Sequence, residues 1–560
     1  MSIATAITAL QGKIANAYTA IENKGGTLPA TQNAANLATA IEDIPSGGEG
    51  GPIWGINALS DVCKTRSDPG NGKPTVYFFG GVTKLKFDGI QAVGYYPMLK
   101  MFANNNSLTS VSFPDLLSSK NNAFESAFMS CKNLVSVSMP KNRLEVLQSG
   151  TFSHAFEGCS SLTAATVLCG ANSVKGDTFN AAFKGCSSLS SLPGGVSEID
   201  FCDMRGMQEA FRDCTSLTGA TFTNLSSMSQ SQQFASAFIG CTSLQTASFA
   251  ELSSFDNNSN STFRQAFVNC SSLTAVSFPK LQKGGISSFT SAFTNCTALK
   301  SVDFSALSAT KGTTGESFLF GSAFENCTSL ESASFPSLKT ADGNNALQAM
   351  FKGCTSLTSV SMPNLSSHGT NCFKWMFQGC TALKDVPSFI ANLSSVSGYE
   401  VLLGTFENCT SLSSVSFPNL TSLVVNGTQS SGMYQTCFKG CTNLSSVAFP
   451  EVLSVVHQKT FQEAFANCTN LSSVTFPKLT NLSADRIFAS AFTNCTSLTS
   501  ISFPALSGIT SGVNTFENAF NGCTALTEIH FKTGTESVIT ALNGYSSRWG
   551  ASNATIHFDL

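Results

Sequence analysis

Cysteine is the residue type in this chain whose number and spacing could support chemistry. The 560 residues include 20 cysteines, and fifteen of them recur at intervals of 26 to 32 residues. These fifteen, called the cysteine ladder below, are Cys131, Cys159, Cys186, Cys214, Cys241, Cys270, Cys296, Cys327, Cys354, Cys380, Cys409, Cys441, Cys468, Cys495 and Cys523, and Asn105 holds the same place ahead of them. Such a set could form disulfides, bind a metal or fill a buried core.

The cysteine ladder is predicted to consist of free, buried thiols. In a stack of repeats, neighbouring ladder cysteines would have Cα atoms about 5 Å apart, which is within disulfide range. Equivalent positions, however, point their Cβ atoms in the same direction and not at each other. A line of thiols is also unlike the tetrahedral site that zinc prefers. We therefore expect small apolar fillers here, and no pairing among the other cysteines, which are Cys63, Cys169, Cys202, Cys372 and Cys437.

The remaining reactive residues do not form a recognisable site. The five histidines are scattered, without a His-Glu-x-x-His, Cys-x-x-Cys or triad-like cluster, so each is expected at a surface or an edge: His154, His368, His457, His530 and His557. The string from Gly70 to Lys73 lacks the first glycine of a phosphate loop and is interpreted as a turn. No region outside the repeats is large enough for a catalytic domain. The sequence therefore predicts no catalytic residue, no metal site and no cofactor, in a protein that is not an enzyme.

Asparagines in front of several ladder cysteines match the pattern for N-glycosylation. They are Asn269, Asn295, Asn326, Asn408, Asn467 and Asn494, each followed by Cys and then Thr or Ser. Each of these residues is already explained by the repeat, since a turn favours Asn and the ladder requires Cys. We therefore interpret the match as a coincidence.

The elements that position the ladder can be assigned from one unit, Phe461 to Pro477, which reads FQEAFANCTNLSSVTFP. Phe461, Ala464 and Phe465 are spaced i, i+3 and i+4, which predicts one inward face of a short helical turn. Asn467 holds a place that is Gly or Asn in nearly every unit, and both tolerate the left-handed conformation that ends a helix. The chain is expected to reverse direction there.

A short strand is predicted after this turn. Leu471, Val474 and Phe476 are the apolar positions, and polar residues flank Val474, which indicates a strand with one buried face. Proline then ends the strand in many units: Pro114, Pro140, Pro279, Pro336, Pro363, Pro418, Pro450, Pro477 and Pro504. A sustained period of this length is typical of stacked units that cannot bury their apolar face alone. We therefore expect a repeat solenoid of the leucine-rich-repeat type, a parallel β-strand stack with short helical or 3-10 turns, of about sixteen repeats over residues 101–531.

Composition and charge exclude several partners. Charged residues make up 12% of the chain, the formal net charge is −3 and no Lys/Arg cluster is present, so nucleic acid and anionic membranes are not expected partners. No run of 18 or more apolar residues predicts membrane insertion. The first residues lack the basic and apolar regions of a signal peptide, which predicts assembly in the cytoplasm.

The two ends of the chain differ from the repeat. Ile3, Ile7, Leu10, Ile14 and Ile21 follow the spacing of a coiled coil, so residues 1–46 are predicted to be a helical attachment or oligomerisation module of two or three chains. A helical hairpin that docks on the solenoid is the alternative. Residues 47–52 are interpreted as a Gly-rich linker, 53–100 as an N-terminal cap and 532–560 as a C-terminal cap, because an open stack exposes apolar surface.

On these motifs, about residues 98 to 531 resemble the BspA-like, or Treponema-type, leucine-rich repeats, whose pattern is close to A-F-x-x-C-x-x-L-x-x-I-x-I-P. This chain has Phe where many relatives have Ile, and slightly longer units. The resemblance implies adhesion or recognition by bacterial, phage or protist surface proteins, and it brings no catalytic residues. Residues 1–46 are similar to short N-terminal modules of tail-associated proteins from phages of gut bacteria.

Binding is expected where the repeat varies. The outward strand positions are mostly Ser, Thr and Ala, whose hydroxyls could contact sugars or could simply keep the sheet soluble. The segments between the strand proline and the next Phe vary in length, and loops on a rigid scaffold often carry recognition. Trp375 occupies an outward position that is small or polar in most units, and Tyr399 and Tyr434 lie in insertions. We predict that these three aromatic residues contribute to a ligand-binding surface.

Two functions fit these features. The first is a phage or prophage tail-associated receptor-binding protein, located in the virion tail. It would bind a bacterial cell-surface receptor, glycan or protein, through the solenoid and other tail proteins through the N-terminus, as a homotrimer if it resembles tail fibres. The second is a cell-surface adhesin of a bacterium or protist. A purely structural spacer would predict uniform loops, whereas these loops vary.

Overall fold

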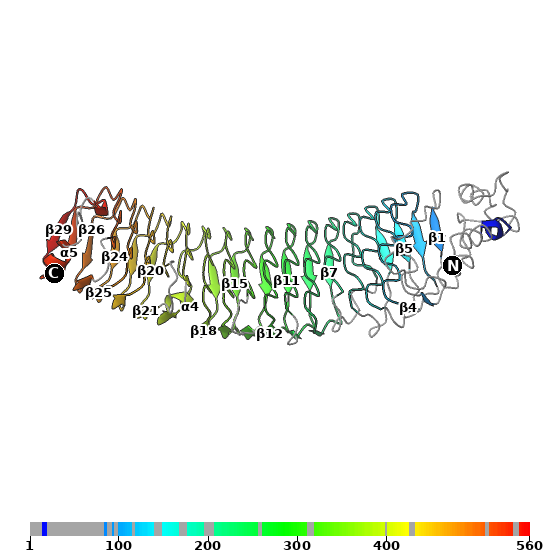
Figure 1. Ribbon diagram of the computed structural model, residues 1–560, viewed down its shortest axis with the longest axis horizontal. Helices are drawn as coiled ribbons and strands as arrows, with labels where there is room; N and C mark the ends of the chain where they lie inside the picture. Colours follow the sequence, from blue (N-terminus) through cyan, green and yellow to red (C-terminus); the bar gives the residue numbers. More distant parts are fainter. Residues whose placement is uncertain are drawn as a thin grey trace, which may run out of the picture. The chain divides into compact units, whose positions relative to one another are not determined.

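The computed structural model describes residues 14–19, 83–86, 92–93, 99–114, 118–138, 148–166, 176–194, 196, 206–255, 260–310, 318–397, 400–424, 432–509, 514–540 and 548–560. The chain divides into two compact units, Met1–Glu251 and Leu252–Leu560. Within each unit the chain winds through successive coils, and most coils contribute short strands to parallel sheets (Figure 1). Of the helices in the described ranges, none is long and apolar enough to cross a bilayer.

The N-terminal unit contributes two kinds of strand. The first strand of each coil is mostly three residues long: β1 (Lys84–Lys86), β3 (Ser110–Ser112), β5 (Ser136–Ser138), β6 (Ala164–Thr166), β7 (Gly219–Thr221) and β9 (Thr246–Ser248). The second strand has two residues: β2 (Ala92–Val93), β4 (Ser118–Ser119) and β8 (Ser227–Met228). Strands β1, β3, β5 and β6 form one sheet in that order, and every pair is parallel.

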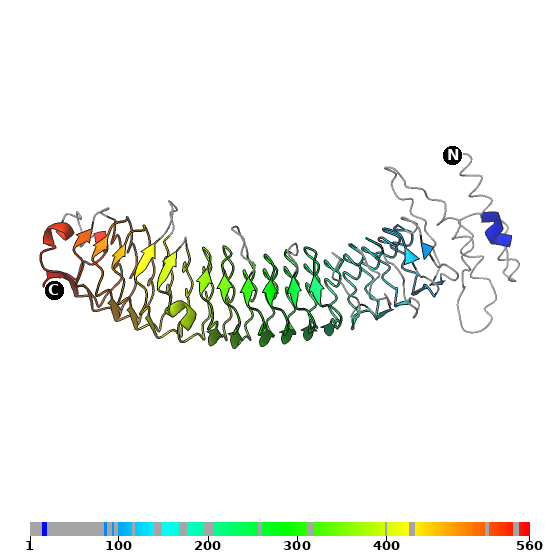
Figure 2. The same cartoon turned by 90° about the horizontal axis from the view of Figure 1, so that it is seen from below.

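The C-terminal unit repeats this arrangement, and Figure 2 separates its two rows of strands. The first row consists of β11 (Ala275–Ser277), β13 (Ser301–Asp303), β15 (Ser332–Ser334), β17 (Ser359–Ser361), β20 (Ser414–Ser416), β22 (Ser446–Ala448), β24 (Ser473–Thr475), β26 (Ser500–Phe503), β28 (Glu528–Phe531) and β29 (Thr555–Phe558). The second row consists of β10 (Ser254–Phe255), β12 (Lys283–Gly284), β14 (Ala309–Thr310), β16 (Thr340–Ala341), β18 (Ser367–His368), β19 (Ser395–Ser397), β21 (Ser422–Val424), β23 (Ser454–Val455), β25 (Asn481–Leu482) and β27 (Gly508–Ile509). Two short helices, α4 (Ser388–Ala391) and α5 (Glu536–Thr540), are part of this unit.

The predicted strand pattern is confirmed. In β24 the side chain of Val474 is buried while Ser473 and Thr475 are exposed, and Val474 pairs with Val447 of the preceding coil. Equivalent residues therefore stack directly on each other, which builds a continuous apolar layer from a three-residue strand. The structure is a parallel solenoid of the leucine-rich-repeat type, as the sequence predicted.

The segment between the strands is a run of β-turns and not the short helical turn that the spacing suggested. The N–H of Ala464 donates to the carbonyl of Phe461 at 3.0 Å, as in a 3-10 turn, but Glu463 has φ +53° and Asn467 has φ +63°. A helix cannot continue through a left-handed residue. The N–H groups of Phe461 and Glu463 donate instead to the next coil, at 2.8 and 3.0 Å. Each turn run is thus hydrogen-bonded to the next, much as strands are.

Left-handed residues occur where the sequence predicted them. The position before the ladder cysteine has positive φ at Gly158, Gly185, Gly240, Asn295, Asn326, Gly353 and Asn467. A second left-handed position lies four residues earlier, and there the residue is rarely glycine: His154, Glu209 and Trp375 are examples. Sequence reasoning missed this position because its residue types do not reveal its conformation.

Columns of phenylalanine form the core. The Phe that lies two positions before the Gly or Asn of each unit stacks on the equivalent Phe of the next coil. The ring centroids of Phe351 and Phe377 are 5.7 Å apart, and those of Phe377 and Phe406 are 5.5 Å apart. Both pairs are within 9° of parallel. Aromatic pairs at this separation add about 0.5–1.5 kcal/mol beyond the burial of their area, so the columns hold neighbouring coils in register.

The ladder cysteines are free and buried, as predicted, and their thiols also make hydrogen bonds. From Cys131 to Cys523, Cys270 aside, the Sγ atom lies 2.9–3.2 Å from the carbonyl oxygen of a Phe in the preceding coil. The thiol is the donor. The interpretation of these residues as purely apolar fillers was therefore incomplete, because these fourteen thiols also link two coils.

Candidate functional site

The second row of strands in the C-terminal unit is interrupted at the coil formed by residues 380–409. Strands β10, β12, β14, β16 and β18 lie in one sheet in that order, and β19, β21, β23, β25 and β27 lie in another. Strand β18 ends the first sheet and β19 begins the second, although they belong to successive coils. Helix α4 lies between them in the chain.

A column of hydrogen bonds that runs from coil to coil is open at this point. The N–H and the hydroxyl of Ser366 both donate to the carbonyl of Lys339, at 2.9 and 3.1 Å. Thr421 donates in the same way to the carbonyl of Ser394, at 3.1 and 3.3 Å. In the part of the chain that the structure describes, Ser394 makes no such bond to Ser366. Among the described residues, the column therefore lacks the bond from Ser394 to Ser366. The bond from Leu453 to Thr421 is also missing, but there β21 and β23 still pair, whereas β18 and β19 do not.

The local sequence explains this opening. Ser367 follows Val360 by seven positions, whereas Ser395 follows the equivalent Val386 by nine. The longer segment begins with Pro387, whose carbonyl accepts from the N–H groups of Ile390 and Ala391 at 2.9 and 3.0 Å. A proline directly before a helix is well placed, since its carbonyl can accept the first helical bonds. Ile390 is fully buried in α4 and supplies the apolar residue that the core needs.

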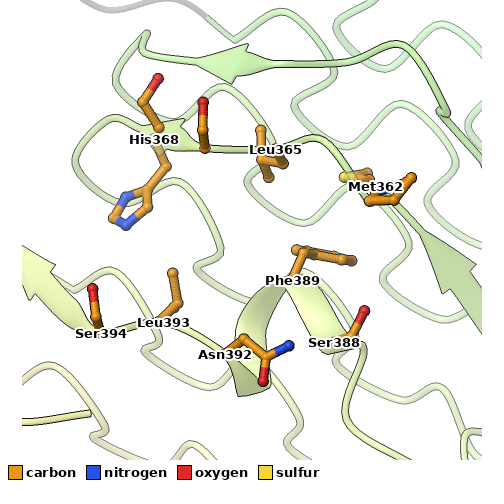
Figure 3. A pocket seen from close by; sticks show the side chains of 11 residues that line it. Met362, Leu365, His368, Ser388, Phe389, Asn392, Leu393 and Ser394 are labelled. Carbon is orange, nitrogen blue, oxygen red and sulfur yellow. The ribbon is translucent and has the colours of Figure 1, made fainter. Parts of the chain in front are cut away.

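A groove of about 440 Å³ lies beside the open step (Figure 3). Its lining combines apolar and uncharged polar residues and contains no Asp, Glu, Lys or Arg: Met362, Pro363, Leu365, Ser366, Ser367, His368, Ser388, Phe389, Asn392, Leu393 and Ser394. Leu365 is half-buried here, although its equivalents Leu338 and Leu420 are fully buried in their coils. Phe389 and Leu393 are also half-buried. The opening thus exposes apolar surface that other coils cover.

His368 supplies the titratable group of the groove. Figure 3 shows its ring projecting from β18, on the opposite side of the groove from Phe389. Burial lowers the pKa of His368 below its usual value, so the imidazole is neutral at neutral pH. Its Nδ1 lies 3.2 Å from the carbonyl oxygen of Gly369, which can only accept, so Nδ1 donates and Nε2 is left as the acceptor.

Trp375 lies on the turn run next to the same coil. It is half-buried, with φ +55°, and Lys374 Nζ is 4.3 Å from the centroid of its ring. Lys374 also forms an ion pair with Glu400. Gly404 makes room for the indole, because a Cβ on Gly404 would lie 2.5 Å from Trp375 Cδ1. The tryptophan and the glycine facing it are therefore a matched pair in neighbouring coils.

The other predicted site residues have different outcomes. Tyr434 is fully buried, stacked on Phe461 with ring centroids 5.4 Å apart, so the prediction that it is an exposed contact was wrong. Tyr434 takes the place of a phenylalanine in a core column. The sequence did not reveal this burial, because the segment before Tyr434 is longer than in other units. Tyr399 lies outside the described residues.

The predicted oligomerisation residues are largely outside the described ranges. Residues 14–19 are helical, and Ile14 is half-buried there. The other four, Ile3, Ile7, Leu10 and Ile21, are not among the described residues. The coiled coil therefore stays a prediction.

Histidine and cysteine form no metal cluster in the described ranges, where no group of three or more His, Cys, Asp or Glu side chains could hold an ion. His457 is buried at 9% exposure, so the expectation of a surface position was wrong for it. His154 pairs with Glu157 at 2.6 Å, and His530 with Asp559 at 2.9 Å. Cys372 and Cys437 are free and buried, whereas Cys63, Cys169 and Cys202 lie outside the described residues.

Sequence reasoning missed the groove itself. Its signal was Pro387 in a unit that lacks the usual Phe-Pro ending, combined with the two additional residues before β19. Phe389 and Leu393 would then have been recognised as apolar residues without a place in the repeat.

Several solved structures are similar to this chain at low identity. A leucine-rich repeat protein of T. pallidum is 21% identical, with 40% of this chain and 77% of that chain covered and a TM-score of 0.24. A leucine-rich repeat protein of Leptospira interrogans is 10% identical, with 91% and 99% covered and a TM-score of 0.21. The Arabidopsis receptor kinase HAESA, solved with a peptide hormone and a co-receptor, is 16% identical, with 83% and 69% covered and a TM-score of 0.22. No curated protein matches the sequence.

The family is shown by the sequence model for the BspA type leucine rich repeat region. It matches in six copies, over residues 89–190, 181–318, 263–398, 320–463, 376–505 and 431–543. These copies overlap and together span most of the solenoid. This chain therefore belongs to the BspA-type leucine-rich repeat family.

Proposed function

We propose that this BspA-type repeat protein is a recognition or adhesion protein that binds a cell-surface ligand at the coil formed by residues 380–409. The observation that carries the proposal is the open step between Ser366 and Ser394, where half-buried Leu365, Phe389 and Leu393 meet uncharged polar groups. Concave sites that combine apolar walls with a few oriented polar groups are typical of ligand binding. The proposal assigns no catalytic step to the protein.

Trp375 and Tyr399 belong to the same proposal as second contacts. Trp375 keeps part of its ring accessible and is held by Lys374 and by the space over Gly404, so it could present a fixed aromatic surface. Tyr399 follows β19 in the sequence and is included on its position alone. A bacterial cell-surface glycan or protein is the expected partner.

Binding of the purified full-length protein to whole bacteria tests this function. Ser394→Phe fills the groove and should abolish binding. Ser507→Phe is the matched control, because Ser507 is also exposed and donates to Thr480 at the same position of an intact step. Unchanged binding by Ser394→Phe would refute the groove as the contact site.

Within this role, we propose a phage or prophage tail-associated receptor-binding protein, with a cell-surface adhesin as the alternative. The support is the non-repeat segment 1–46, whose heptad spacing fits an attachment or trimerisation module. Deleting residues 1–51 should then leave binding to cells intact and reduce the mass in solution to that of one chain. Tail, baseplate or lysis genes beside this gene would favour the virion, and their absence would favour the adhesin.

A further inference from the structure

We infer that the groove takes up an extended peptide segment of a partner protein, which pairs with β18 as an added strand. This inference rests on the proposed function and names the ligand class of the same groove. The juxtaposition that supports it is the Ser366 carbonyl on one wall and the Ser394 N–H on the other, neither of which has a backbone partner among the described residues.

The intact coils show what belongs between these two walls. Lys339 donates its N–H to the carbonyl of Ser308 at 2.9 Å, and its own carbonyl accepts from the N–H of Ser366 at 2.9 Å. A residue of an added chain in the same conformation would donate to Ser366 and accept from Ser394. The open step therefore offers the acceptor and the donor that one backbone unit of an extended peptide can satisfy.

Among the described strands, β18 has a free edge, and its two residues are the usual length of a strand in the second row. It pairs with β16 through Thr340 with Ser367 and Ala341 with His368, and it ends its sheet. Sheet edges of this kind accept an added strand, which gains affinity from backbone hydrogen bonds and specificity from side-chain pockets. Strands β16 and β18 pair through only two residues each, so a short peptide segment can form an equivalent strand pair with β18.

The walls favour uncharged side chains on the added peptide. No Asp, Glu, Lys or Arg lines the groove, and burying a charge without a partner is costly. Phe389, Leu365 and Leu393 can cover an apolar side chain. The volume of about 440 Å³ is within the range of sites that hold small ligands or short segments.

A neutral oligosaccharide could also contact the serine hydroxyls and Phe389. A sugar chain, however, has no backbone of alternating N–H donors and carbonyl acceptors, and an N-acetylated sugar carries its amides only as side groups. The backbone pattern therefore favours a peptide, and the sugar becomes an outcome of the test.

The test uses the full-length protein and two synthetic hexapeptides that copy residues 364–369, Asn-Leu-Ser-Ser-His-Gly, acetylated and amidated at their ends. One is unmodified, and the other carries N-methyl groups on its central three amides, which removes donors without changing side chains. Binding is measured by NMR line broadening up to millimolar peptide, for the natural protein and for the Ser394→Phe and Ser507→Phe variants. Maltohexaose and chitohexaose are tested in parallel.

We expect the unmodified peptide to bind at least tenfold more tightly than the methylated one, and this binding to disappear in Ser394→Phe but not in Ser507→Phe. Equal binding of the two peptides, or none, overturns strand addition, as does sugar binding that Ser394→Phe alone removes. If Ser394→Phe still abolishes binding to cells, the groove retains its proposed function and only the peptide inference fails. If it does not, both fail.

Discussion

Replacing Gly353 with alanine tests whether the Gly/Asn position before the ladder cysteine is set by backbone conformation alone. Gly353 has φ +73°, and a Cβ there would overlap the Oδ1 atom of Asn326 in the preceding coil. Gly379, in the next coil, has φ +76°, but its nearest neighbour across the stack is the Cα of Gly353, 3.7 Å from where a Cβ would be. The two glycines share a conformation and differ in what they face.

The expected costs differ for that reason. A left-handed alanine costs about 1–2 kcal/mol, of which part is recovered because alanine restricts the unfolded chain, so Gly379→Ala should destabilise its coil by about 1 kcal/mol. Gly353→Ala must also displace Asn326, whose Nδ2 donates to Asn295 Oδ1 at 3.0 Å. Losing that hydrogen bond adds about 0.5–1.5 kcal/mol. The total for Gly353→Ala is then about 2 kcal/mol.

Amide hydrogen exchange measured by mass spectrometry over residues 320–380 is a suitable assay, because repeat arrays open locally and not only as a whole. Asn326→Gly should relieve the overlap, so that Gly353→Ala in that background costs as little as Gly379→Ala. Equal costs for the two alanine variants, or no rescue by Asn326→Gly, would refute the reasoning.

The core and the surface give further tests. Tyr434→Phe should raise the free energy of unfolding by about 1–2 kcal/mol, because the buried hydroxyl has no hydrogen-bond partner among the described residues; a lower urea midpoint would contradict this. Burial raises the pKa of Cys131 and Cys523 from 9.0 to about 11, so their stabilisation is complete below pH 9 and is lost as the pH rises from 9 to 11, at up to about 1.4 kcal/mol per pH unit for each thiol. Alanine at both positions should reduce the slope of the urea midpoint against pH over that range by the share of these two thiols, because other buried ladder thiols also have raised pKa values. Trp375→Ala should cost its coil only about 0.5–1 kcal/mol, since it removes one cation–π contact with Lys374, and a larger loss in hydrogen exchange would show a core role.

Residues that repeat in every unit allowed most of the fold to be predicted. The alternation around Val474 and the Gly or Asn before each cysteine each have one physical explanation, and repetition confirms it many times over. The turn run was mistaken for a helix because i, i+3, i+4 spacing also suits consecutive β-turns, and a residue such as Glu463 does not reveal a left-handed backbone. Burial of Tyr434 escaped notice for a related reason, since Tyr replaces Phe with little change in size.

The groove could not be predicted from the repeating residues, because it depends on a backbone hydrogen bond that one coil does not make to its neighbour. In an intact step each backbone carbonyl is satisfied by the next coil, so a uniform solenoid has few backbone groups left for a ligand. The two additional residues around α4 remove the bonds from Ser394 to Ser366 and expose Leu365. An unpaired group costs about 1–3 kcal/mol when it is buried, but water reaches this groove and reduces that cost. A ligand that displaces the water can form both hydrogen bonds with Ser366 and Ser394. In the intact steps of the solenoid, the same backbone groups are already bonded to the neighbouring coil and are not available to a ligand.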